Sequence, residues 1–278
     1  MTRAAMAAAR PQAEFRARSV RRIPHRYGAR RVEALDHLGA ADHAPRRSPI
    51  VYVHGGGWTS GLRELYTPEL AWFARRGYPV FNIDYPLAPE HPWPEPFVSV
   101  LRAIAWVGER FEGADRVHLM GDSAGGNLVM MAGIAIENRE ILAALAPDLA
   151  EAAFPEVRSV VSLYGVLDRH SWIRNGFPNA RMFMASYLGP DGFREEALAH
   201  VAATPLDHAF DRHPPCLLVA GTKDPLAEST TLCHDTLKAR GGRVEQRIYP
   251  GEHHAFFNFF WRPAARALRR DVLSFLEG

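Results

Sequence analysis

From residue 50 to the C-terminus, short apolar runs alternate with segments in which apolar residues recur every three to four positions. The apolar runs are four to seven residues long, rich in β-branched residues, and bounded by glycine, proline or charged residues. Such runs are typical of buried strands. We expect such strands at residues 50–53, 79–83, 117–120, 157–163 and 215–220, and a last, more polar strand at residues 244–249.

The segments between these runs favour helices. Thr67, Pro68 and Glu69 are typical of a helix start, with Thr67 as N-cap and proline in the first turn. Helical spacing recurs later, at residues 97–108, 127–136, 228–240 and 268–276. Strands that alternate with helices of this length indicate an α/β protein with a mostly parallel central sheet flanked by helices.

One crossover breaks this alternation. Residues 168–212 separate two predicted strands and are rich in large apolar side chains. These are Trp172, Phe177, Met182, Phe183, Met184, Tyr187 and Phe193. A connection of this length usually carries structure of its own, so we expect a lid or binding element here.

Composition narrows the class of protein. With 278 residues, 47% hydrophobic and 23% charged, the chain is typical of a globular protein, which excludes disordered and fibrous classes. Residues 1–47 carry eleven arginines against four acidic residues. These arginines are scattered and lack interleaved aromatic residues, so we interpret the segment as solvated or partly packed and expect neither a nucleic acid nor a membrane partner.

The cysteines and the apolar runs indicate a compartment. Cys216 and Cys233 are too few for a disulfide framework and match no zinc spacing, so we expect two packed thiols. No apolar run is long enough to cross a bilayer, and residues 4–9 are too short for a signal-peptide core. A soluble cytoplasmic protein without a metal ion or cofactor is therefore expected.

Residues 121–125 read Gly-Asp-Ser-Ala-Gly and fit the pattern G-x-S-x-G. A predicted strand precedes them and a predicted helix follows, which is the context of a nucleophile elbow. Such a turn exposes the Ser123 hydroxyl and places the Ala124 amide at a helix N-terminus, where negative charge is favoured. The alternative is a glycine-rich phosphate-binding turn or a plain strand–helix loop.

Residues 54–58 read His-Gly-Gly-Gly-Trp and follow the first of these strands. Successive glycines allow the backbone to approach a ligand with its N–H groups. We expect Gly56, Gly57 and Ala124 to form an oxyanion hole, in a loop that Gly55 shapes. Trp58 follows directly, so we expect it in the substrate pocket; the alternative is a flexible glycine loop.

With these two motifs, the sequence resembles the hormone-sensitive-lipase-like branch of the α/β-hydrolases, the bacterial family IV carboxylesterases. The matching segments are residues 54–58, 84–92, 121–127, 224–226 and 249–251 with His254. The resemblance implies a single α/β-hydrolase domain over residues 1–278. It also implies a helical cap, built from residues 1–48 and about 168–210.

The resemblance also implies the chain order serine, carboxylate, histidine for a catalytic triad. Asp224 follows the predicted strand 215–220, whereas the rival Glu228 lies a turn into the next helix. His253 and His254 compete by position alone. The family pattern of histidine, small residue and phenylalanine matches residues 254–256, although the family usually has glycine where Ala255 stands.

These residues predict a serine carboxylesterase that hydrolyses short-chain esters through an acyl-enzyme. Ser123, Asp224 and His254 would be catalytic, and the partner would be a small-molecule ester. One alternative is an arylformamidase-like amide hydrolase with the same triad. Another is a hydrolase-derived binding protein, against which the presence of His254 argues. The resemblance is compatible with a homodimer but does not determine the oligomeric state.

Overall fold

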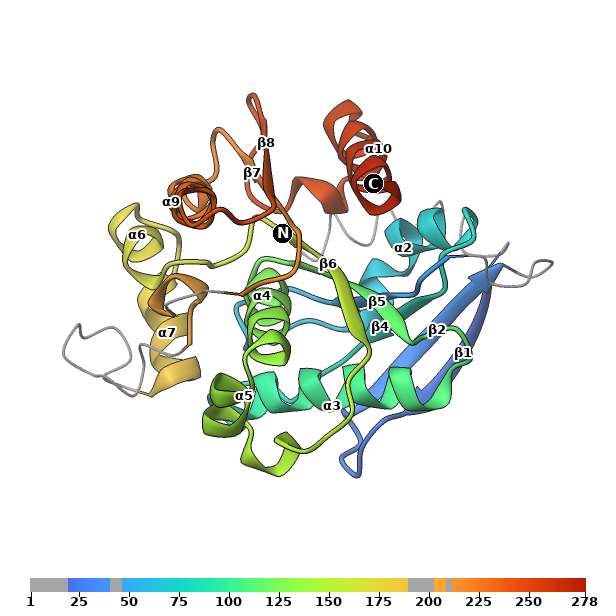
Figure 1. The fold of residues 1–278 in the computed structure, drawn as a ribbon. Helices are drawn as coiled ribbons and strands as arrows, with labels where there is room; N and C mark the ends of the chain where they lie inside the picture. The colour runs from blue at the N-terminus through green and yellow to red at the C-terminus, as the bar shows by residue number, and fades with distance from the viewer. Residues whose placement is uncertain (1–19, 41–46, 190–202, 209–211) are drawn as a thin grey trace.

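A twisted eight-stranded sheet forms the centre of the computed structural model, which describes residues 20–40, 47–189, 203–208 and 212–278 (Figure 1). The strand order is β1-β2-β4-β3-β5-β6-β7-β8. The strands from β4 to β8 in this order are parallel, whereas β1 and β2 are antiparallel to their neighbours. Their bounds are β1 Val20–Arg26, β2 Ala34–Ala40, β3 Ile50–Val53, β4 Val80–Ile83, β5 Arg116–Asp122, β6 Glu156–Leu163, β7 Cys216–Gly221 and β8 Val244–Tyr249.

Helices connect the parallel strands and cover both faces of the sheet (Figure 1). They are α2 Thr67–Ala74, α3 Glu95–Arg110, α4 Ala124–Glu137, α5 Arg139–Leu145, α6 Arg169–Arg174, α7 Ala180–Leu188, α9 Ala227–Ala239 and α10 Pro263–Glu277. Short 3₁₀ turns lie at Arg63–Tyr66, Pro147–Leu149, Pro205–Asp207 and Phe256–Asn258. Helix α2 begins at Thr67 with Tyr66 as its N-cap, one position from the predicted cap.

All six predicted strands are present, and the predicted mostly parallel sheet with flanking helices is confirmed. Residues 50–53 and 244–249 form strands with the predicted bounds. The strand order was not predictable from the pattern, because β3 lies between β4 and β5. Because these strands run parallel, the carboxyl ends of β3, β5, β7 and β8 lie along one edge of the sheet.

The prediction of a cap over residues 1–48 is wrong for residues 20–40, which form β1 and β2 of the sheet. Leu35 and Leu38 of β2 are fully buried, and Leu35 pairs with Ile83 of β4. Burial of these leucines against the sheet explains why the segment extends it. Residues 1–19 and 41–46 lie outside the described residues.

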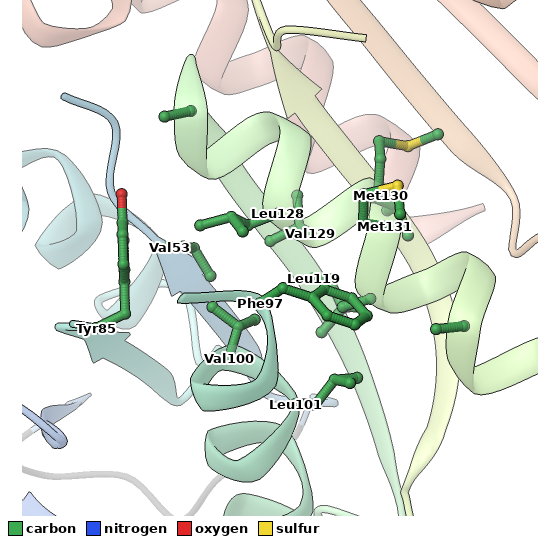
Figure 2. Packing of buried hydrophobic residues seen from close by; sticks show 14 of the residues in the cluster. Val53, Tyr85, Phe97, Val100, Leu101, Leu119, Leu128, Val129, Met130 and Met131 are labelled. Carbon is green, nitrogen blue, oxygen red and sulfur yellow. The ribbon is translucent and has the colours of Figure 1, made fainter. Parts of the chain in front are cut away.

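Two apolar layers hold the helices to the sheet. In the first, Phe97 and Val100 of α3 lie near Leu119 of β5 and Leu128 of α4 (Figure 2). The second layer packs α2 and α10 on the other face. It includes Leu70, Phe73, Val80, Met120, Leu268 and Val272. The strands from β3 to β7 are therefore buried on both faces, which explains their continuous apolar runs.

The long crossover after β6 has structure of its own, as predicted, in the part that the structure describes. Asp168 caps helix α6, because its carboxylate accepts hydrogen bonds from the amides of His170 and Ser171. Helix α7 follows, and the turn Pro205–Asp207 leads back toward β7. Residues 190–202 and 209–211, with Phe193 among them, lie outside the described residues.

Both cysteines are free and buried, so the predicted packed thiols are confirmed. Burial raises the pKa of Cys233 to about 12, so this thiol stays protonated at neutral pH. Within the described ranges, no helix combines the length and apolar character that a membrane crossing requires. The same ranges contain no group of three His, Cys, Asp or Glu side chains arranged to hold a metal ion.

Candidate active site

Ser123 lies on a sharp turn between β5 and α4, with φ 53° and ψ −118°. The turn needs glycine on both sides. A Cβ on Gly125 would lie 2.0 Å from the carbonyl oxygen of Val53, and one on Gly121 would lie 2.4 Å from that of Gly125. A side chain at Gly125 would therefore collide with the end of β3, and one at Gly121 would collide with the backbone of the turn itself. The Ser123 amide donates to the Leu163 carbonyl at 2.8 Å, which holds the turn against β6.

A hydrogen-bonded chain links Ser123, His254 and Asp224, which lie far apart in sequence. The Ser123 hydroxyl lies 2.9 Å from His254 Nε2, and His254 Nδ1 lies 2.9 Å from Asp224 Oδ2. The other Asp224 oxygen accepts the Leu226 amide at 2.9 Å, and Asp224 is only 4% exposed. This fixed carboxylate orients the imidazole so that Nε2 faces the serine.

Neighbouring strand ends explain why these residues meet. Asp224 follows β7 and His254 follows β8, and these two strands are paired in parallel. Their loops are also bonded to each other, since the Lys223 amide donates to the Glu252 carbonyl at 2.9 Å. The two competing residues lie elsewhere: His253 is exposed, and Glu228 forms an ion pair with Arg174.

Ala255, next to His254, has a φ of 64°. This left-handed conformation favours glycine. The backbone therefore accounts for the glycine that the resembling family usually has at this position, and it makes the alanine here a mildly strained choice.

Two aromatic rings pack against the His254 imidazole. Tyr164 and Phe177 each have a ring centroid 4.9 Å from the imidazole centroid, with interplanar angles of 66° and 85°. Tyr164 is fully buried, whereas Phe177 is half-buried and belongs to the crossover after β6. The rings restrict the imidazole, and its side chain keeps 20% of its surface exposed.

The glycine loop after β3 reaches the same edge of the sheet. The Gly55 amide donates to Asp122 Oδ1 at 2.7 Å, so this N–H already has a partner. Gly56 and Gly57 have φ values of 125° and 62°, and a Cβ on Gly56 would lie 1.9 Å from the Ser60 carbonyl oxygen. The φ of Gly56 is accessible only to glycine, and the left-handed φ of Gly57 favours glycine. Ala124 begins α4, and an amide in the first turn of a helix has no partner within the helix.

Asp122 connects the glycine loop to the serine turn, a role that the sequence analysis missed. Its carboxylate accepts the Tyr52 hydroxyl at 2.8 Å and the Tyr66 hydroxyl at 3.3 Å, besides the Gly55 amide. Burial raises the pKa of Asp122, and these donors and nearby histidines oppose that rise. The only feature of the sequence that could have indicated this role was the position of Asp122, between an apolar strand and the serine.

His54 is buried beneath the loop. Its Nδ1 donates to the Gly55 carbonyl at 2.8 Å, its Nε2 lies 3.5 Å from Asp84, and its ring stacks on Tyr85. Burial alone would raise the pKa of Asp84. The nearby His54 ring and the hydrogen bond from the Arg63 amide outweigh burial, and the pKa of Asp84 is lowered. Asp84 is therefore ionised at neutral pH and holds His54 in place.

Trp58 does not line an open pocket, contrary to the sequence expectation. Its side chain has no exposed surface, because it stacks on Tyr187 with centroids 4.2 Å apart and meets the edge of Trp172. It is thus part of the core between the loop and the crossover. Phe183 of α7 instead lies over the loop, since a Cβ on Gly57 would be 2.7 Å from its ring.

Comparison with known proteins places this chain in a family. Residues 50–258 match the family described as the alpha/beta hydrolase fold, and the chain therefore belongs to that family. It is 28% identical over 260 residues to Esterase LipC of Mycobacterium tuberculosis, covering 85% of this chain and 61% of LipC. It is 30% identical over 244 residues to Esterase LipQ of the same organism, covering 84% of this chain and 56% of LipQ.

The chain thus spans about three fifths of the length of these two relatives. Esterase B from Lactobacillus rhamnosis has the same fold, with a TM-score of 0.79 at 18% identity over 99% of this chain and 93% of that one. The esterase of Pyrobaculum calidifontis gives 0.76 at 25% identity over 99% and 91%. The predicted α/β-hydrolase fold and the resemblance to the hormone-sensitive-lipase-like branch are confirmed.

Proposed function

We propose that this protein is a serine carboxylesterase that hydrolyses short-chain carboxylic esters through an acyl-enzyme. The hydrogen-bonded chain from Ser123 through His254 to Asp224 carries the proposal. The names of the two relatives from Mycobacterium tuberculosis, both esterases, support it.

In the first half of the reaction, Ser123 Oγ attacks the ester carbonyl carbon while His254 Nε2 takes the hydroxyl proton. Asp224 stabilises the imidazolium that forms. The amides of Gly56, Gly57 and Ala124 donate to the oxyanion, in a loop that the Gly55–Asp122 hydrogen bond holds. The carbon–oxygen bond to the alcohol then breaks, and His254 returns the proton to the departing oxygen.

In the second half, a water molecule attacks the acyl-enzyme carbonyl and gives its proton to His254. The tetrahedral intermediate uses the same amides and collapses to release the carboxylic acid. The proton passes from His254 back to Ser123 Oγ. These steps use the chain's own residues and water alone.

The side chains over the serine favour short acyl groups. Phe183 lies over Gly57 of the glycine loop and is only half-buried. We infer that this ring narrows the space beside the glycine loop in which an acyl chain would lie. Each methylene of the acyl chain that fits adds only about 0.8 kcal/mol of apolar burial. The steric clash of a long acyl chain with the ring therefore costs more than its extra methylenes gain.

Rates on p-nitrophenyl esters of increasing acyl length test the proposal. We expect hydrolysis by the wild-type protein, covalent labelling of Ser123 by a fluorophosphonate, and loss of both in Ser123→Ala. A protein that is not labelled and hydrolyses no ester is no serine esterase. Faster cleavage of an aryl formamide than of an aryl ester of similar size would indicate an amide hydrolase instead.

We also place the reaction in the cytoplasm, which fractionation of the source cells tests. The homodimer that the family resemblance leaves open is tested by light scattering on the purified protein.

A further inference from the structure

Among the described residues of the crossover after β6, the aromatic side chains divide into two groups by exposure. Trp172 and Tyr187 are fully buried, together with Trp58 of the glycine loop. Phe177 and Phe183 are half-buried and contact the candidate site, Phe177 at His254 and Phe183 at Gly57. Of these described rings, Phe177 and Phe183 alone have surface left that a bound ester can touch.

Phe177 is the outer of the two rings on His254. The imidazole meets Tyr164 and Phe177 at the same centroid distance, 4.9 Å, but Tyr164 has no exposed surface. A molecule that approaches His254 Nε2 from solvent can therefore touch Phe177 and cannot touch Tyr164.

A row of buried aromatics holds the Phe177 ring from behind. Trp172 lies 5.3 Å from it between centroids, and Trp172 in turn meets the edge of Trp58 at 5.9 Å. The Phe177 amide also donates to the Trp172 carbonyl at 3.2 Å. Because its backing is packed, the ring has little freedom to withdraw, and it forms a firm apolar wall beside the imidazole.

The chemistry of ester cleavage determines which part of the substrate meets this wall. When the carbon–oxygen bond breaks, the proton on His254 Nε2 moves to the departing oxygen, so that oxygen must lie within hydrogen-bond reach of Nε2. The alcohol attached to this oxygen therefore lies beside the imidazole. The carbonyl oxygen lies at the glycine loop instead, where Phe183 is found.

We propose that Phe177 is a specificity-determining residue for the alcohol part of the ester, and that it favours esters of aromatic alcohols over those of small alkyl alcohols. A flat apolar alcohol can pack on the exposed part of the ring, with the edge-to-face or offset geometry that aromatic pairs prefer. This inference rests on the proposed esterase function.

Benzyl acetate and ethyl acetate test it, because they share one acyl group and both release an alcohol that needs protonation. We expect the wild-type enzyme to have a higher kcat/KM for benzyl acetate. In Phe177→Ala, the benzyl-to-ethyl ratio of kcat/KM should fall by about tenfold, the scale of a lost apolar contact in a binding pocket. Phe177→Tyr, which keeps the ring, should keep the ratio.

Phe183→Ala is the matched control, since it removes another half-buried phenylalanine from the same crossover. It should leave the benzyl-to-ethyl ratio unchanged, whatever it does to the absolute rates. Thermal unfolding of each variant reports whether it is folded. If Phe177→Ala does not fold, Phe177→Leu gives the same comparison, because it leaves a smaller cavity than the alanine.

Three results would overturn the inference. The first is an unchanged ratio in folded Phe177→Ala or Phe177→Leu. The second is an equal loss on both esters, which would show that the ring acts only by holding His254. The third is a similar drop in Phe183→Ala. Failure of the proposed function is distinct, because the wild-type enzyme would then cleave neither acetate nor any p-nitrophenyl ester.

Discussion

The Gly55 amide donates a 2.7 Å hydrogen bond to Asp122, the residue directly before the candidate nucleophile. This bond joins the loop after β3 to the turn after β5. The position of the amides of Gly56 and Gly57 relative to Ser123 therefore depends on one buried carboxylate.

Asp122→Ala should lower both activity and stability. It leaves the Gly55 amide and the Tyr52 hydroxyl without their acceptor, and each unsatisfied buried donor costs about 1–3 kcal/mol. A displaced loop should lower kcat by about a hundredfold, the scale reported for loss of one oxyanion donor. Ester kinetics and chemical denaturation measure the two effects. Asp122→Asn keeps one acceptor oxygen and should lose less of both; equal losses in the two variants would contradict this account.

Ser123→Ala should fold as the wild type and lose ester hydrolysis by about 10⁴-fold or more. The hydroxyl makes the hydrogen bond to His254, and the turn itself is held by the backbone. Single-turnover assays and circular dichroism check this. Retention of most of the activity would refute the assignment of the nucleophile.

His254→Ala should cost a factor similar to Ser123→Ala, because both belong to one hydrogen-bonded chain. The effects should not add in the double variant. His253→Ala is the control, since this neighbouring side chain is exposed, and it should change kcat little. The reverse ranking of the two histidines would show that the other one is the base.

Phe183→Ala should extend the range of acyl chains. The ring lies over Gly57, where its removal opens space beside the glycine loop. For the wild type we expect the highest kcat/KM with acyl chains of roughly two to six carbons. Burial of each methylene that fits contributes about 0.8 kcal/mol to binding. The variant should shift this optimum to longer chains, while Met182→Ala, at an exposed neighbouring position, should not. A wild-type preference for chains of a dozen carbons would contradict the interpretation of a narrow site.

Stability should fall as the pH drops through the slightly acidic range. Burial, with Arg158 nearby, lowers the pKa of His118 from 6.5 to about 4. Between these values the unfolded chain binds the proton and the folded protein does not, so the free energy of unfolding rises with pH from about 4 to 6.5. The contribution is at most about 3.4 kcal/mol. Denaturation at pH 5 and pH 7.5 measures it, and the difference should shrink in His118→Gln; an undiminished difference would assign the effect to other groups.

Local patterns in the sequence were sufficient to predict much of the structure. The six parallel strands and the glycines of the serine turn could be predicted from the sequence, because they depend on residues that are close together in the chain. Buried strands such as β3, β4 and β7 need continuous apolar runs, whereas the partly exposed β8 is more polar. Gly121 and Gly125 are required by contacts that a Cβ would make with adjacent backbone. Ser123 follows from the same kind of local pattern, whereas Asp224 and His254 were chosen over Glu228 and His253 with the help of the family resemblance.

Tertiary structure decided what depends on distant partners. Residues 20–40 became strands because β2 could pair with β4, which no local pattern indicates. Trp58 follows the glycines in sequence, yet Tyr187, 129 positions later, stacks on it and removes it from any pocket. The bond from Asp122 to Gly55 likewise depends on β3 and β5 being neighbours. Strand order determines such contacts, and it results from the packing of all the elements together, which the alternation of polar and apolar residues along the chain does not encode.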